Sequence, residues 1–428
     1  MRDLVVTFLV FGSLPLILYR PYIGILAWSW VSYMNPHRLT WGFAYNFPFA
    51  FSIAVVLLIG IFLSKEPKKI PLTRESVLLI LFTLWMFIST IFSQYPSLAW
   101  AEWDRVWKIM LVTFLTLMLM GNEKRINALI WVIVFSIGFF AIKGGIFTII
   151  TGGVYKVMGP PQSFIGDRND LALAINMTLP LMRYLQLRAD NRWIRQGLTV
   201  AMILSAFGVV GTLSRGGLLG LLAMSSVLLL KTRRSLQVAI FLAFVGVMIF
   251  SFMPESWKER MSTMLSPEVS QTDGSARGRV KAWEFGYYKS LERPLTGGGF
   301  KIYLAEHGKD VHSIWFGVLG EQGFVGLALY LLILLMAWRS SSWIIKNAKK
   351  HKETEWLRDL AVMLQASMAG YAVSGSFLGR AYFDLFYQLL AVLILCKVLL
   401  KQYLAKEIEQ TSDDIISFGG TVSRSSSN

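Results

Sequence analysis

The stretch "NALIWVIVFSIGFFAIKGGIFTII" (127–150) decides the class of fold, because it is a continuous apolar run with a single charged residue. A helix needs about 20 apolar residues to cross the hydrocarbon core of a bilayer. Apolar residues follow one another here without alternation, which predicts a membrane helix and excludes a barrel strand. Hydrophobic residues make up 54% of the chain and charged residues 16%. The sequence therefore predicts an all-α, polytopic membrane protein.

Similar runs recur along the chain and predict about twelve transmembrane helices. The predicted spans are 5–34 (broken at Arg20–Pro21), 48–63, 76–93, 106–120, 127–150, 170–187, 196–213, 216–230, 236–253, 312–338, 359–378 and 383–400. The first of them fits either one broken helix or two short ones, and the choice changes the side of Met1. Its basic and apolar start lacks a small-residue cleavage site, so we expect a retained membrane segment and not a signal peptide.

Short loops rich in lysine and arginine mark the cytoplasmic side of a membrane protein. The predicted spans place five such loops on one side, namely 64–75, 121–127, 188–196, 231–235 and 338–359. The other side, which we expect to face the periplasm, carries the longest polar segment. The predicted organisation is N-terminal transmembrane helices at 1–253, a long periplasmic loop containing helices at 254–311, C-terminal transmembrane helices at 312–405 and a disordered cytoplasmic tail at 406–428.

The net charge of +16 is explained by the basic cytoplasmic loops, so we expect no nucleic-acid partner. The lone cysteine, Cys396, lies in an apolar run and cannot form an intrachain disulfide. Histidines are dispersed, and no Asp-x-Asp pattern occurs on the periplasmic face, so we expect neither a metal site nor a cofactor.

Arginines occur in short loops of the predicted periplasmic face, where the charge bias disfavours them. Arg215 in "TLSRGG" begins an apolar helix with no acidic neighbour, and a cation there opposes the helix dipole. A bound phosphate would relieve the conflict; a guanidinium that snorkels to the interface is the alternative. Arg168 in "GDRND" is a candidate for ligand binding or for pairing with the adjacent carboxylates.

The segment "GSARGRVKAWEFGYYKSLERPLTGGGF" (274–300) supplies a second group of cations. In a helix, Arg279, Trp283 and Tyr287 share one face, and Arg277 lies close by. Guanidinium and aromatic groups together suit a sugar phosphate, and an amphipathic helix on the outer leaflet is an equally good interpretation. "TGGGF" lacks the lysine of a phosphate-binding loop, so a tight turn is expected there.

"KDVHSIWFGVLGEQGFVGL" (309–327) places His312 at the mouth of a membrane helix. An imidazole in this position can act as a base near neutral pH, although a helix-capping or interfacial role is the simpler interpretation. Glu321 lies nine residues further on, about half a turn out of phase and ~13 Å deeper. It therefore cannot orient His312 from the same helix, and we expect it to make a buried polar contact.

These elements, in order, resemble the O-antigen ligase family of bacterial membrane glycosyltransferases over roughly residues 160–330. The histidine at the helix mouth, followed by glutamate and glycine, is the most specific part. The N-terminal third, including "MNPHRLTWGFAYNF", is similar to a subgroup described as O-glycosylation ligases of exosortase systems.

The resemblance implies metal-independent, inverting transfer of a glycan from undecaprenyl diphosphate to an acceptor hydroxyl at the periplasmic face of the inner membrane. The acceptor in the best-known members is a sugar of the lipid A–core. Arg215 and Arg279 match the family's diphosphate-binding arginines, and His312 matches its catalytic histidine. Arg277, Arg168 and Trp283 are further candidates for substrate binding.

Three alternatives remain open. An O-antigen polymerase or a protein O-glycosylation ligase would use the same donor with another acceptor. A transporter of lipid-linked glycans belongs to a different class, and such proteins often contain repeated halves with broken helices near the midplane. The sequence shows no convincing repeat, and its functional charges cluster at one face, which favours an enzyme.

Overall fold

The computed structural model describes residues 1–231, 239, 243, 246–247, 255 and 274–422. In these residues the chain forms helices and no strands, so the all-α prediction is confirmed. The α-helices are α1 (Arg2–Tyr19), α2 (Tyr22–Met34), α3 (Phe49–Leu63), α4 (Arg74–Ile91), α5 (Pro96–Leu119), α6 (Glu123–Ile150), α7 (Arg168–Arg188), α8 (Arg192–Gly211), α9 (Arg215–Lys231), α13 (Gly274–Glu292), α14 (Ile314–Asn347), α15 (Glu355–Gly375) and α16 (Asp384–Val422).

Five of the described helices, α1, α4, α6, α8 and α14, are long and apolar enough to cross a membrane. Helix α3 is apolar but shorter. The predicted span at 236–253 and the first part of the long loop lie almost wholly outside the described residues. These helices are typical of a multi-pass membrane protein. The count of about twelve transmembrane helices and the long periplasmic loop remain predictions.

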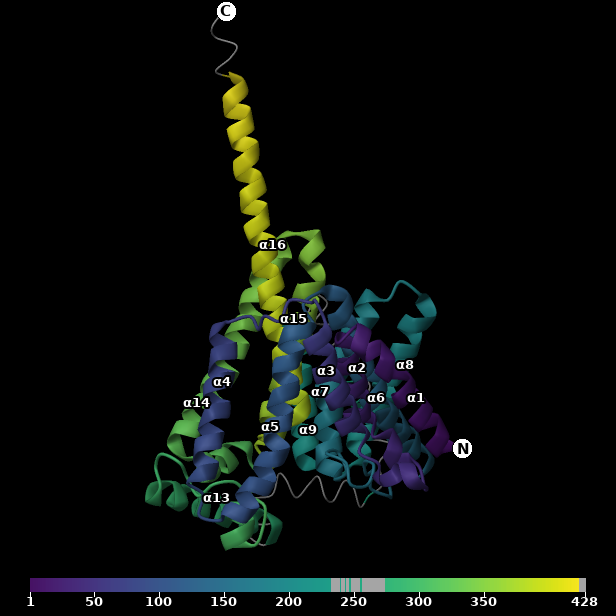
Figure 1. The fold of residues 1–428 in the computed structure, drawn as a ribbon. Helices are drawn as coiled ribbons and strands as arrows, with labels where there is room; N and C mark the ends of the chain where they lie inside the picture. Colours follow the sequence, from purple (N-terminus) through teal and green to yellow (C-terminus); the bar gives the residue numbers. More distant parts are fainter. Residues whose placement is uncertain (232–238, 240–242, 244–245, 248–254, 256–273, 423–428) are drawn as a thin grey trace, which may run out of the picture.

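Consecutive helices alternate in direction, so their connections fall at two ends of the bundle (Figure 1). One end, here named the α13 end, holds α13 and the connections 35–48, 92–95, 151–167, 212–214, 293–313 and 376–383. The opposite end holds 64–73, 120–122, 189–191 and 348–354. Four of the five basic loops lie at the opposite end, as the sequence predicted, and Arg125 there pairs with Glu66 at 2.8 Å.

The first predicted span consists of two helices, which answers the question that the sequence left open. Pro21 separates α1 from α2, because a proline inside a helix lacks the N–H donor and clashes with the preceding turn. The carboxylate of Asp3 accepts hydrogen bonds from the backbone N–H groups of Gly42 (3.0 Å) and Ala44 (3.2 Å). Met1 therefore lies at the α13 end, beside the connection between α2 and α3.

Helix α16 runs as far as Val422 and projects beyond the other helices (Figure 1). Residues 406–422 are thus helical in the structure, where the sequence analysis expected a disordered tail. The stretch after residue 400, "KQYLAKEIEQ", is rich in strong helix formers, and its Tyr403 and Glu407 contact Glu353 and His351 of the connection between α14 and α15. The last residues, 423–428, lie outside the described part of the chain.

Helix α14 is broken at Gly323, whose φ of 70° and ψ of −171° are not helical. The break frees backbone groups, and the segment "PLTGGG" (294–299) bonds to them. Gly298 N donates to Gly320 O (2.8 Å), Gly299 N donates to Glu321 O (3.0 Å), and Phe324 N donates to Pro294 O (2.9 Å). The glycine-rich stretch forms the expected turn, and this turn packs against α14 where the helix is broken at Gly323.

Side chains of α4 bond to the remaining free backbone groups at the break of α14. Trp85 Nε1 donates to Gln322 O (3.0 Å), and Ser89 Oγ donates to Glu321 O (3.1 Å) and Thr296 O (2.7 Å). The Glu321 carboxylate accepts a hydrogen bond from Lys301 N (3.0 Å), a polar contact of the kind predicted from the sequence. Irregular backbone at membrane depth is tolerated only where the protein itself satisfies its polar groups, and here it does.

Replacing Gly323 with alanine should destabilise the protein by about 3 kcal/mol or more. The backbone conformation at Gly323 is one that only glycine adopts readily, and an added Cβ would lie 2.2 Å from Leu295 O. The midpoint of thermal unfolding of the purified protein in detergent measures the effect.

Gly197→Ala is the matched control. Gly197 lies inside α8, and an added Cβ would meet nothing within 4 Å. Alanine there should raise stability by about 0.5–1 kcal/mol through its higher helix propensity. Equal midpoints for the two variants would show that the break in α14 does not depend on glycine.

Candidate functional site

Arg215 is the first residue of α9, and the turn before it is held in place by several hydrogen bonds. Leu213 has a left-handed φ of 52°. Gly217 N donates to Ser214 Oγ (3.0 Å), so Ser214 caps the helix. Arg168, the first residue of α7, donates to Leu213 O (2.8 Å) and Thr212 O (3.3 Å). Arg168 thus positions the turn that carries Arg215.

Glycines set the place of α9 against its neighbours. A Cβ added at Gly220 would overlap Ser374 Oγ at 1.8 Å, and one at Gly217 would lie 2.6 Å from the Ala172 Cβ. Small residues let membrane helices approach closely. At the start of α9, an added Cβ at Gly216 would lie 3.1 Å from the Phe377 Cβ. Arg215, which is half-buried, therefore lies beside the C-terminal end of α15.

His312 lies two residues before α14 and has a left-handed φ of 48°. This conformation is uncommon for a residue with a side chain, although histidine is among those enriched in it. Two contacts bring the start of α14 to the same end of α15. Trp315 Nε1 donates to Ser376 Oγ (2.8 Å), and an added Cβ at Gly375 would lie 2.8 Å from Ile314 Cδ1.

Helix α13 contacts the start of α14 through Trp283. The indole Nε1 donates to Val311 O (3.1 Å), and the ring stacks on Phe316 with centroids 5.3 Å apart and an interplanar angle of 7°. Trp283 was predicted to bind substrate, and in the structure it holds the residue that precedes His312. Arg279 is half-buried one turn earlier on α13, and Arg277 is exposed.

A pair of charges links α7 to the connection between α15 and α16. Arg380 Nε donates to Asp170 Oδ1 at 2.7 Å, with a second bond between the same groups. Asp170 is only 3% exposed. Burial by itself would lower the pKa of Arg380, but the hydrogen bonds and charge of Asp170, together with the charge of Asp310, raise it. Arg380 therefore stays protonated, and its partner Asp170 is the last carboxylate of "GDRND".

The structure thus brings three predicted elements to one place, the α13 end of α15. Arg215 adjoins Gly216, which lies against Phe377, and His312 precedes Ile314 and Trp315, which contact Gly375 and Ser376. Helix α13 reaches the residue before His312, Val311. Among the side chains that the structure describes, no carboxylate forms a hydrogen bond or ion pair with the His312 ring.

Comparison with known families bears on this arrangement. A family model described as O-antigen ligase matches residues 200–331, which include Arg215, Arg279, Trp283 and His312. This match supports the assignment of the segment to the O-antigen ligase family. Residues 1–189, which include Arg168, match a family of unknown function, DUF5935. No curated protein matches the chain.

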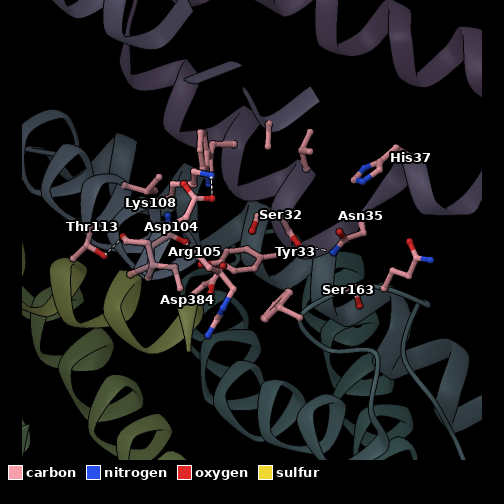
Figure 2. A pocket seen from close by; sticks show the side chains of 18 residues that line it. Ser32, Tyr33, Asn35, His37, Asp104, Arg105, Lys108, Thr113, Ser163 and Asp384 are labelled. Atoms are coloured by element: carbon pink, nitrogen blue, oxygen red, sulfur yellow. Dashed lines mark hydrogen bonds and ion pairs between the residues drawn. The ribbon is translucent and has the colours of Figure 1, made fainter. Parts of the chain in front are cut away.

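A cavity of about 410 Å³ lies at the α13 end, and no residue of the O-antigen ligase segment lines it (Figure 2). Its walls come from α2, α5, the connection 162–164 and the start of α16. Most of its polar lining belongs to the N-terminal family of unknown function: Ser32, Tyr33, Asn35, His37, Asp104, Arg105, Lys108, Thr113, Gln162 and Ser163, joined by Asp384 and Gln388 of α16. None of the predicted site residues lines this cavity.

The sequence analysis assigned no function to the polar residues of 35–47 and 93–104. Their meeting depends on contacts between distant segments. Tyr33 donates to Gln388, Arg105 donates to Tyr382 O (3.5 Å), and the rings of Phe164 and Phe383 lie 5.3 Å apart. Burial and the charge of Arg38 lower the pKa of His37 to about 4, so this imidazole is neutral at pH 7.

Asp170→Asn should lower the free energy of unfolding by about 2 kcal/mol, less than the 3–5 kcal/mol typical of fully buried pairs. We expect a smaller loss of stability because the Arg380 side chain is 37% exposed. Water can therefore solvate part of its charge once the pair is broken. The midpoint of thermal unfolding in detergent measures the loss.

Glu355→Gln serves as the control for this variant. Glu355 pairs with Arg358 on α15 at 3.0 Å, and its side chain is 46% exposed. Exposed pairs contribute less than about 1 kcal/mol. If both variants shift the midpoint equally, the link between α7 and the 376–383 connection contributes no more than a surface pair does.

Proposed function

We propose that the protein is an O-antigen ligase, which transfers a glycan from undecaprenyl diphosphate to a hydroxyl group of lipid A–core at the periplasmic face of the inner membrane. One observation carries the proposal. Within the O-antigen ligase segment, the starts of α9 and α14, with Arg215 and His312, pack against the same end of α15.

Arg215 and Arg279 are proposed to bind the diphosphate of the donor. When the glycosidic bond breaks, its electron pair stays on the bridging oxygen, and negative charge grows on the leaving lipid diphosphate. Guanidinium groups held in a partly desolvated site stabilise such charge strongly. Arg215 also begins a helix, whose free N–H groups add to the attraction for phosphate. The two arginines would supply this stabilisation without a divalent metal.

His312 is proposed to be the general base. The neutral imidazole accepts the proton of the acceptor hydroxyl as the hydroxyl oxygen forms a bond to the anomeric carbon. Attack occurs from the side opposite the departing diphosphate, so the configuration at that carbon is inverted. The left-handed backbone at His312 supports this role, because strained residues persist mostly where function requires their geometry. Arg168 and Trp283 would act as positioning residues.

The acceptor decides between ligase, polymerase and protein ligase. The N-terminal third, which resembles a subgroup described as O-glycosylation ligases and matches a family of unknown function, is the observation that favours a protein acceptor as the second candidate. Purified protein would be incubated with a lipid-linked glycan and either lipid A–core or a candidate protein. Sugar on lipid A–core supports the proposal, whereas longer lipid-linked chains indicate a polymerase.

His312→Ala should slow transfer by about a hundredfold or more, which is the usual contribution of a general base, while donor binding stays near normal. Turnover in the purified assay and donor affinity are the two measurements. His351→Ala is the control, because His351 lies at the opposite end and contacts Glu407. Near-normal turnover of His312→Ala would contradict its role as base.

Arg215→Ala and Arg279→Ala should each weaken donor binding about tenfold or more, since a charge-assisted hydrogen bond is lost. Lysine at either position should restore binding only in part, because it lacks the two-pronged geometry of arginine. Lys281→Ala, an exposed cation on α13, should leave donor affinity unchanged. If both arginine variants bind the donor normally, the diphosphate is bound elsewhere.

A further inference from the structure

A second cavity, of about 570 Å³, lies at the opposite end of the molecule, between the N-terminus of α4, α14 and α16. Its volume falls in the range of small-molecule sites. Its lining is Leu72, Thr73, Arg74, Glu75, Met336, Arg339, Ser340, Trp343, Lys397 and Lys401. None of these residues belongs to the candidate site at the α13 end, so the cavity needs its own explanation.

One of its four cations is satisfied within the protein. Lys397 Nζ donates to Glu75 Oε1 (2.6 Å) and to Ser340 Oγ (2.9 Å), and Ser340 Oγ donates to the same carboxylate. Glu75 is 2% exposed, so it is the buried centre of this cluster and joins α4, α14 and α16. The positive charge of Lys397 is therefore already neutralised.

Three cations remain, one from each of these helices: Arg74, Arg339 and Lys401. All are exposed, and among the side chains that the structure describes in 1–231 and 277–410 no carboxylate pairs with any of them. Arg74 is also the first residue of α4, where the helix dipole adds positive potential. Like charges gathered around one cavity repel each other, and an anion bound among them would remove the repulsion. The cavity thus favours an anionic ligand.

The apolar residues of the lining indicate which chemical group accompanies the anion in the ligand. Leu72, Met336 and Trp343 lie beside the three cations, and Leu72 is 78% exposed. An apolar side chain next to unpaired cations suits a ligand with an anionic head and an apolar tail. The cavity also borders the basic connection 64–73 and the end of α14, which lie among the predicted cytoplasmic loops. Basic pockets between membrane helices on that side bind anionic headgroups.

We propose that Arg74, Arg339 and Lys401 bind the phosphate of an anionic phospholipid of the cytoplasmic leaflet, with the acyl chains along Leu72, Met336 and Trp343. The site lies at the other end of the helices from His312, and its occupancy is independent of the glycosyl transfer proposed above. Its failure would leave the proposed function untouched.

Native mass spectrometry of the full chain in detergent tests the proposal. The probes are phosphatidylglycerol, phosphatidylcholine with the same acyl chains, and inorganic phosphate. We expect the protein to bind phosphatidylglycerol more tightly than phosphatidylcholine. The double variant Arg339→Gln/Lys401→Gln should weaken phosphatidylglycerol binding about thirtyfold, or about fivefold for each charge. Arg339→Gln alone should show the fivefold effect if the double variant does not fold.

The matched control is Lys124→Gln/Arg195→Gln. Both residues are exposed at the same end but do not line the cavity, so the net charge falls equally and phosphatidylglycerol binding should not change. Three results would overturn the proposal: unchanged binding in the first double variant, an equal loss in the control, or displacement of phosphatidylglycerol by inorganic phosphate. The last result would identify a site for free phosphate.

Discussion

Backbone polar groups that a helix leaves unpaired inside an apolar bundle must find partners in the protein, and the break of α14 at Gly323 is where this constraint acts most strongly. The contacts that satisfy these backbone groups also fix the positions of several segments at the α13 end. The segment 294–299 enters the break, and Trp85 and Ser89 of α4 bond to the remaining carbonyls. Docking of this segment fixes the end of α13, and α13 in turn contacts Val311 beside His312.

Close helix packing supplies the second support of the candidate site. Helix α15 contacts α9 through glycines and small side chains, and it contacts the start of α14 through Gly375 and Ser376. Association of helices in an apolar environment depends on such close approach and on hydrogen bonds between helices, because lipid already solvates apolar surface. The same end of α15 therefore orders two segments that are about a hundred residues apart in the sequence.

Charged residues are used differently at the two ends. At the α13 end, Arg380 is bound to Asp170, and Arg168 is bound to backbone carbonyls, so both of these loop arginines have structural partners. At the opposite end, Lys397 is neutralised by Glu75, while three cations around the same cavity lack a carboxylate partner in the described residues. The positive-inside rule counts every lysine and arginine in the same way. The partners of each cation in the structure show which of them hold the fold together and which are available to bind a ligand.

The sequence by itself determined the helical class, the approximate limits of most described helices and the resemblance of 200–331 to the O-antigen ligase family, because these depend on apolar runs and on residues close together in the chain. It also predicted Arg215 and His312 at helix starts. It could not determine that Arg168 positions a turn, that Trp283 contacts Val311, or that polar residues of α2, α5 and α16 enclose a cavity. Those outcomes depend on which distant segments meet. Only tertiary packing decides that, since a side chain chooses its partner by distance in space and not by separation in the sequence.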